Sequence, residues 1–209
     1  MAAVVETLPV MSPYQFTTNC YVAAPAPNSA RVVVIDPAGE LPSILEVIGG
    51  RTLAAIIVTH RHDDHLGALK GLVEKTSAPV YAHCLDATAI EERCFPPARD
   101  RGTLGLVSRL DEGDTVTCDT LTLTVLHTPG HTIGSMCLYS APDKLLFSGD
   151  TIFRGTTGRT DLPTGSPSEM AQSLIKLSAL PDDVTVYPGH DAPTTIAFER
   201  TRALVEYRL

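Results

Sequence analysis

Residues 58–65, with the sequence VTHRHDDH, contain three of the seven histidines of the chain. His60 and His62 are two positions apart, so in an extended segment both side chains point the same way. Asp64 and His65 begin the turn into the next predicted helix, from which they can face a neighbouring point. Imidazole and carboxylate groups together are ligands that suit zinc, iron and manganese. The segment therefore predicts a metal site.

Single imidazole or carboxylate groups also follow three later apolar runs. These groups are His131, Asp150 and His190, and a glycine stands directly before each of them. A tight backbone turn at such a glycine lets the side chains converge. The full set is too large for one tetrahedral ion and suits two ions that share one carboxylate. We therefore predict two divalent ions per chain, with zinc favoured over iron or manganese, held by His60, His62, Asp64, His65, His131, Asp150 and His190.

Short apolar runs that end at turn residues predict the strands that must position these groups. The predicted strands are Tyr21–Ala24, Arg31–Ile35, Leu53–Val58, Val80–Ala82, 121–126, Met136–Tyr139, Leu145–Phe147 and Val184–Tyr187. Helices are expected after Ser43, after Asp64, in the first part of 86–108 with a loop in the rest of that range, after the capping box at Ser166, and over Thr194–Leu209. Each half of the chain gives strands and then a helix. We therefore expect two sheets packed on each other with helices outside, as one α/β domain over residues 1–209.

Composition limits the classes of function. Of the 209 residues, 44% are hydrophobic, which is enough to bury one substantial core. The formal net charge is −8 and no Lys/Arg cluster is present, so nucleic acid is not an expected partner. No apolar stretch approaches the ~20 residues of a membrane span, and the N-terminus lacks a positive n-region. The five cysteines show no CxxC spacing, so reduced thiols in a cytoplasmic protein are expected.

The segment His60–His65 matches HxHxDH, and His131 in HTPGHT, Asp150 in FSGD and His190 in YPGH follow in order. This series resembles the metallo-β-lactamase superfamily from about Asn19 to Thr195. The resemblance implies a four-layer αββα sandwich with the site at one edge, between the sheets. It also assigns the ligands: His60, His62 and His131 to the first ion, Asp64, His65 and His190 to the second, and Asp150 to both. True β-lactamases of the superfamily usually lack the histidine that matches His65, which argues against that activity.

Two further stretches, Asp150–Phe153 and Gly158–Asp161, are similar to the glyoxalase II (hydroxyacylglutathione hydrolase) group. That resemblance implies hydrolysis of the thioester of S-lactoylglutathione or a related S-acyl thiol by a metal-bridging hydroxide. The longer members add a C-terminal helical region that grips glutathione. This chain ends about nineteen residues after His190, like the short bacterial form, so another small thiol could replace glutathione.

Roles can be assigned within this expected reaction. Asp64 and Asp150 are the expected catalytic carboxylates, because each could orient the hydroxide. Arg159 is a candidate for binding a substrate carboxylate, or it pairs with Asp161 and is structural. Arg154 is a weaker candidate of the same kind. The expected partner is a small thioester, with no membrane and no nucleic acid, and the oligomeric state is not readable from the sequence.

Other activities share these motifs. A persulfide dioxygenase would use one iron, held in that family by residues matching His60, His131 and Asp150, and would oxidise a thiol persulfide to sulfite. A lactonase and a metal-binding protein that has lost catalysis are further alternatives. His83, His127 and the five cysteines fall outside the pattern and are expected to have ordinary structural roles.

Overall fold

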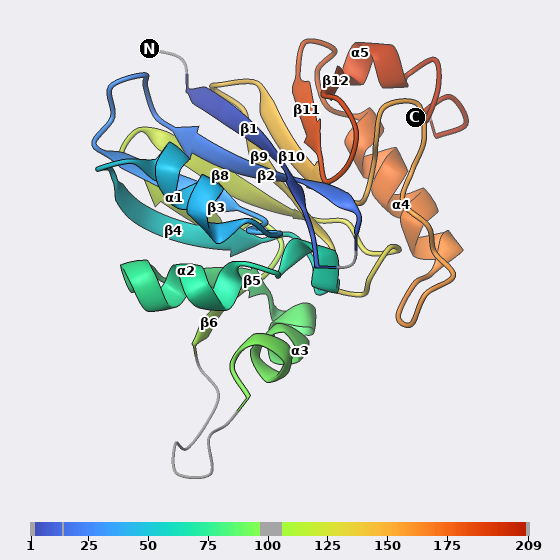
Figure 1. Cartoon of the computed structure of the whole chain (residues 1–209). Helices are drawn as coiled ribbons and strands as arrows, with labels where there is room; N and C mark the ends of the chain where they lie inside the picture. Colours follow the sequence, from blue (N-terminus) through green and yellow to red (C-terminus); the bar gives the residue numbers. More distant parts are fainter. Residues whose placement is uncertain (1–2, 14, 97–105, 208–209) are drawn as a thin grey trace.

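Two mixed β-sheets form the centre of the computed structural model, which describes residues 3–13, 15–96 and 106–207 (Figure 1). Within the described residues each sheet has six strands, in the orders β1-β2-β3-β4-β5-β6 and β12-β11-β10-β9-β8-β7. The first sheet contains β1 Val4–Met11, β2 Thr17–Ala24, β3 Arg31–Ile35, β4 Thr52–Val58, β5 Val80–His83 and β6 Val107–Leu110. The second contains β7 Thr115–Cys118, β8 Leu121–His127, β9 Met136–Ser140, β10 Leu145–Gly149, β11 Thr185–Pro188 and β12 Thr194–Thr195.

Helices cover the outer face of each sheet (Figure 1). Those on the first sheet are α1 Leu41–Ile48, α2 Leu69–Thr76 and α3 Cys84–Cys94, with a 3-10 turn, η1 Asp63–His65, between α1 and α2. Those on the second sheet are α4 Pro167–Ser178 and α5 Ile196–Glu199. No helix in the described ranges has the length and apolar character needed to cross a bilayer.

The strand alternation accounts for the layering. In β3, Val33 and Ile35 point into the core between the two sheets, whereas Val32 and Val34 pack under the helices. The core between the second sheet and its helices is formed by side chains such as Leu146 from β10. The molecule thus has four layers of secondary structure, in the order helices, sheet, sheet, helices, with an apolar core between each neighbouring pair. This is the expected four-layer αββα sandwich.

All eight predicted strands are present, with ends shifted by a few residues at most except in β2, which begins four residues earlier. Ser166 caps α4 as expected, because its hydroxyl accepts a hydrogen bond from the Glu169 amide. Of the helix predicted over Thr194–Leu209, only Ile196–Glu199 is helical among the described residues, and residues 208–209 lie outside them. Two residues of strand and the short α5 come first, and the chain then runs in turns in which Arg202 and Leu204 donate to the Glu199 carbonyl.

Several strands of the structure were not predicted. β1, β6, β7 and the two-residue β12 are the edge strands of the two sheets, and half or more of their residues are not buried. The helix expected within 86–108 is α3, but residues 107–108 belong to β6 rather than to a loop, and 97–105 lie outside the described residues. β6, β7 and β12 have only two to four residues each, which is too short for an apolar pattern to mark them clearly, and solvent covers part of an edge strand.

Candidate metal centre

The seven predicted ligands follow the carboxyl ends of four strands at one end of the sandwich. His60 and His62 follow β4, His131 follows β8, Asp150 follows β10, and His190 follows β11. The 3-10 turn η1 carries Asp64 and His65. Strands β4 and β3 are parallel neighbours in one sheet, and β10 and β11 are parallel neighbours in the other. The loops after these strands therefore meet at the same edge, as ligand-binding loops do in open α/β sheets.

One group of donors consists of three imidazoles. His60, His62 and His131 offer ligand atoms that all lie within 4.8 Å of one another. Nδ1 of His62 is 2.8 Å from Nε2 of His131. The ring of His60 stands edge-on to that of His62, with centroids 4.9 Å apart. Three imidazoles facing one point form a set that zinc or iron accepts.

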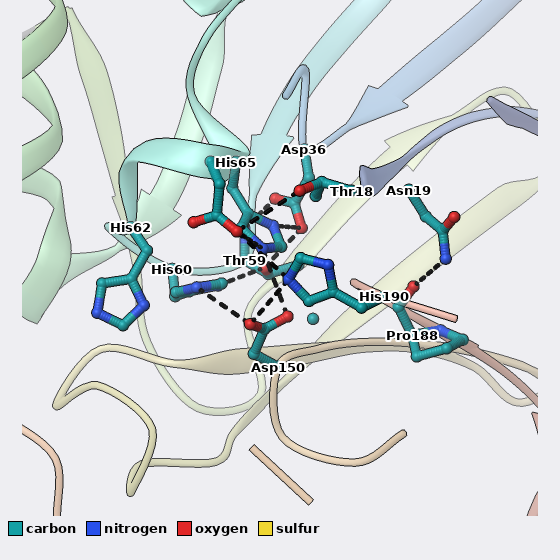
Figure 2. Close-up of polar contacts among 12 residues, drawn as sticks. Thr18, Asn19, Asp36, Thr59, His60, His62, His65, Asp150, Pro188 and His190 are labelled. Atoms are coloured by element: carbon teal, nitrogen blue, oxygen red, sulfur yellow. Dashed lines mark hydrogen bonds and ion pairs between the residues drawn. The ribbon is translucent and has the colours of Figure 1, made fainter. Parts of the chain in front are cut away.

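A second group, Asp64, His65 and His190, satisfies the same 4.8 Å criterion. Asp150 lies between the two groups, as Figure 2 shows for its contacts with His60, His65 and His190. Its Oδ1 is 3.4 Å from Nε2 of His65, and its Oδ2 is 3.4 Å from Nε2 of His190. The same Oδ2 is 3.4 Å from Nε2 of His131 in the first group. One carboxylate thus faces both groups.

Unsatisfied polar atoms indicate that this set fits cations. Nε2 of His60, Nε2 of His65 and Oδ1 of Asp150 are buried and have no hydrogen-bond partner among the described residues. A buried polar atom without a partner is costly, and native proteins leave few of them. All three atoms can donate a lone pair to a metal ion. The αββα sandwich and this His/Asp cluster at its edge together suit divalent metal ions.

The electrostatics of the cluster favour the same conclusion. Burial lowers the pKa of His60 well below its ordinary value and that of His62 to about 4, so both are neutral ligands near pH 7. Burial opposes the charge on Asp150, but His65 and His190 hold the pKa of this carboxyl well below its usual range. Burial likewise opposes charge on His190, yet hydrogen bonds to Asp150 and Asp64 raise its pKa to about 10. Binding of a cation must displace that proton.

Hydrogen bonds from the far ring nitrogens orient three of the imidazoles. Nδ1 of His131 donates to the carbonyl of Arg159 over 2.8 Å, and Nδ1 of His190 donates to the carbonyl of Thr17 over 2.8 Å. Because a carbonyl oxygen can only accept, each bond places the proton on Nδ1 and leaves Nε2 facing the cluster.

The third such bond involves a residue that the sequence analysis missed. Nδ1 of His65 donates to Oδ2 of Asp36 over 2.9 Å, and the Thr59 amide donates to Oδ1 of the same carboxylate over 2.7 Å. Asp36 follows β3 directly, beside the end of β4. A carboxylate at the end of an apolar strand was the available signal. It is the same signal that identified Asp150.

A cavity of about 540 Å³ opens onto the cluster. The ligands His62, Asp64, His131, Asp150 and His190 line one part of it. Phe16, Phe153 and Leu162 supply an apolar wall, and Arg159 is its cationic residue. A small molecule in this space would contact both polar donors and apolar side chains, the usual composition of a ligand site.

The structure places the two candidate arginines differently. Arg159 lines the cavity, and its guanidinium makes two hydrogen bonds to Asp161, of 2.7 and 2.8 Å, on the exposed surface. Arg154 does not line the cavity. Its guanidinium lies over the ring of Phe198, 4.6 Å from the centroid, and donates to the Pro193 carbonyl.

The remaining histidines lie apart from this centre. His83 stacks on His127 with ring centroids 3.9 Å apart. His83, Cys84 and Asp111 also offer donor atoms within 4.8 Å of one another. There the Cys84 thiol donates to the Asp111 carboxylate over 2.9 Å, and the Asp111 side chain is 74% exposed. These donors contact one another, and the exposed Asp111 is open to solvent. All five cysteines are free.

Comparison with other sequences places this arrangement in context. The chain is 36% identical over 189 residues to an uncharacterized protein of Aquifex aeolicus, covering 87% of this chain and 88% of that one. It is 38% identical over 168 residues to a hydroxyacylglutathione hydrolase of Salmonella paratyphi A, covering 78% of this chain and 59% of that enzyme.

Solved structures give the same overall arrangement. The BLEG-1 B3 metallo-beta-lactamase superposes with a TM-score of 0.78 at 31% identity, covering 95% of this chain and 97% of that one. TTHA1623 in a di-iron-bound form gives a TM-score of 0.75 at 35% identity, covering 94% and 98%. ETHE1 from Myxococcus xanthus gives a TM-score of 0.76 at 28% identity, covering 98% and 88%.

The family profile described as the metallo-beta-lactamase superfamily matches residues 13–190. That range begins before β2, ends at His190, and so spans every residue of the cluster. The match, the αββα layers and the metal-ligand geometry agree with one another. The chain belongs to the metallo-β-lactamase superfamily.

Proposed function

We propose that the protein is a metal-dependent hydrolase that cleaves the thioester of S-lactoylglutathione or of a related S-acyl thiol. The observation that carries this proposal is the central position of Asp150, which faces both donor groups at the floor of a 540 Å³ cavity. Such an arrangement suits two ions, and two-metal sites serve hydrolytic reactions. The likeness to a hydroxyacylglutathione hydrolase supports a thioester as the substrate.

The two donor groups divide the ligands between two ions. His60, His62 and His131 would hold the first ion, Asp64, His65 and His190 would hold the second, and Asp150 would contact both. When bound, such ions supply a water molecule whose pKa is near ~7, and they polarise the carbonyl of the substrate.

The side chains of the protein then have separate tasks. The Asp64 and Asp150 carboxylates accept hydrogen bonds and orient the attacking water. Phe16, Phe153 and Leu162 hold the apolar part of the substrate and exclude water around it. A departing thiol has a pKa of about 8.5, so it leaves as a thiolate without a strong general acid. Arg159, at the rim, binds a substrate carboxylate.

A persulfide dioxygenase is the second candidate. The observation that favours it is the identity of the metal in TTHA1623, a 35% identical neighbour solved in a di-iron-bound form; that structure supports iron as the metal but holds two irons where a dioxygenase uses one. His60, His131 and Asp150 would then hold one iron. Nε2 of His60 is 3.9 Å and Nε2 of His131 is 3.4 Å from Oδ2 of Asp150. Two imidazoles and one carboxylate are the ligand set of many non-haem iron oxygenases.

The deciding experiment uses two preparations of the purified chain, one loaded with zinc and one with iron. Hydrolysis of S-D-lactoylglutathione is followed by the loss of thioester absorbance, and oxygen uptake is measured with glutathione persulfide. We expect chelator-sensitive hydrolysis and no oxygen uptake. Oxygen uptake without hydrolysis would replace the hydrolase by the dioxygenase. Neither activity, in protein shown to hold metal, would direct the search to lactones and other thiol carriers.

A further inference from the structure

Asp86 is a buried carboxylate outside the seven-ligand set. It lies in the first turn of α3, and its exposed fraction is 0%. Its Oδ2 accepts a hydrogen bond from the backbone amide of Arg61 over 3.1 Å and another from the hydroxyl of Thr132 over 2.6 Å.

The two donors belong to the two loops that carry the first group of imidazoles. Arg61 stands between His60 and His62, and Thr132 directly follows His131. The first loop follows β4 of one sheet, and the second follows β8 of the other. A single oxygen atom therefore links the parts of the chain that must hold three ligands at a fixed separation.

The surroundings leave Asp86 little freedom. A Cβ atom added at Gly134, in the same loop as Thr132, would lie 2.5 Å from Cγ of Asp86, so the loop can approach only without a side chain there. Ser135 in turn accepts a hydrogen bond from the Thr132 amide over 3.0 Å and keeps the hydroxyl of Thr132 in place. The carboxylate is thus held rigidly against both loops.

Local stability alone does not account for this carboxylate. Its Oδ1 is buried without a hydrogen-bond partner in the described part of the chain, and Nη1 of Arg61 is 3.7 Å away. A second buried carboxylate on the same helix, Glu91, accepts from the Val107 amide over 3.0 Å and pairs with Arg109 over 3.2 Å. Glu91 ties its helix to β6, far in the chain from any ligand loop, whereas Asp86 ties its helix to two ligand loops.

We propose that Asp86 is a positioning residue for the first metal ion: it fixes the His60–His62 loop against His131 and so presets three imidazoles for one cation. The inference rests on the metal-binding part of the proposed function and not on the thioester substrate. Groups that orient metal ligands without touching the ion commonly contribute about 10- to 100-fold to its affinity.

The test compares Asp86→Ala, Asp86→Asn and Thr132→Val with Glu91→Gln as the matched control. Each protein is titrated with zinc against a chromophoric chelator, and each is also loaded with cobalt, whose visible spectrum reports the ligand geometry. The melting temperature of the metal-free protein is measured separately.

We expect Asp86→Ala to lower the affinity for one of the two ions by about 10- to 100-fold and to change the cobalt spectrum. Asp86→Asn keeps an oxygen that can accept both hydrogen bonds, so it should restore part of the affinity. Thr132→Val should lower the affinity for the same ion by a smaller factor. Glu91→Gln should lower the melting temperature of the metal-free protein and leave zinc affinity and the cobalt spectrum unchanged.

Unchanged zinc affinity and an unchanged cobalt spectrum in folded Asp86→Ala protein would overturn the proposal. If that variant does not fold, wild-type affinity in both Asp86→Asn and Thr132→Val would overturn it equally. Equal losses in Glu91→Gln and Asp86→Asn would show a general effect of helix stability instead. Because every readout is metal binding, failure of the wild-type protein to cleave thioesters would leave the result intact.

Discussion

Among single residues, Asp150 is the one on which we expect both ions to depend. Its two oxygens face imidazoles from both donor groups, and its side chain is nearly buried. Asp150→Ala should therefore lose bound metal and activity together, with hydrolysis reduced by several orders of magnitude. Elemental analysis and turnover of the same preparation check this. Near wild-type hydrolysis by metal-quantified Asp150→Ala protein would rule out the shared-ligand role.

A substitution at Arg159 is expected to affect substrate binding and not the chemical step. The Arg159 side chain is exposed, and its pair with Asp161 is a surface ion pair, a kind of contact that contributes little to stability. Its backbone carbonyl, which holds His131, is retained in any substitution. Arg159→Ala should thus raise KM several-fold for an anionic thioester and leave kcat and the melting temperature nearly unchanged.

The control for that prediction is Asp161→Asn, which breaks the same ion pair but leaves the guanidinium. Steady-state kinetics of both variants decide between the two roles. If Asp161→Asn raises KM as much as Arg159→Ala does, the pair is structural and Arg159 does not bind the substrate directly.

At the scale of elements, close backbone approach is as important as the ligands. A Cβ atom at Gly189, just after β11, would lie 2.2 Å from Oδ1 of Asp150 and 2.7 Å from Cε1 of His65. Gly189→Ala should displace one of these ligands and lower metal content and activity at least ten-fold. Gly50→Ala is the matched control, since a Cβ there meets nothing within 4 Å. Equal metal content in the two variants would contradict the prediction.

The central strands and the ligands at their ends could be predicted because both leave local signals. β3, β4 and β10 are apolar runs, and a ligand must be one of a few residue types. Edge strands such as β1 and β7 leave weaker signals. The turns after α5 depend on how the chain packs on the second sheet, which no local pattern records.

The supporting carboxylates were harder to predict for a related reason. Asp36 acts on His65 only because β3 and β4 are parallel neighbours, and Asp86 meets Thr132 only because the two sheets are stacked. Spacing within the sequence shows neither relation. That residues 1–209 form one domain stays a prediction.

At the scale of the whole molecule, the proposed ions would connect the two sheets. His60 and His65 belong to loops of the first sheet, and His131, Asp150 and His190 belong to loops of the second. An ion that binds the folded chain alone stabilises it by about 2.7 kcal/mol when its free concentration is 100 times Kd. Removal of metal by a chelator should lower the melting temperature by several degrees, and added zinc should restore it.

Differential scanning calorimetry of the metal-free and reloaded protein checks this prediction, with Asp150→Ala as a control that should not respond to zinc. An equal melting temperature with and without metal would show that the cluster adds nothing to stability. In that case the apolar core alone would hold the two sheets together.

The distribution of donors along the chain sets an order of events during synthesis. His60 emerges 130 residues before His190. At translation rates of roughly 5–20 residues per second, that interval is roughly 7–26 s. Throughout it the nascent chain lacks His190, and for the first 71 residues it also lacks His131, so neither donor group is complete at the start. The second donor group is therefore complete only after β11 has formed, and a cation held before then by Asp64 and His65 alone should remain exchangeable with the surrounding solution.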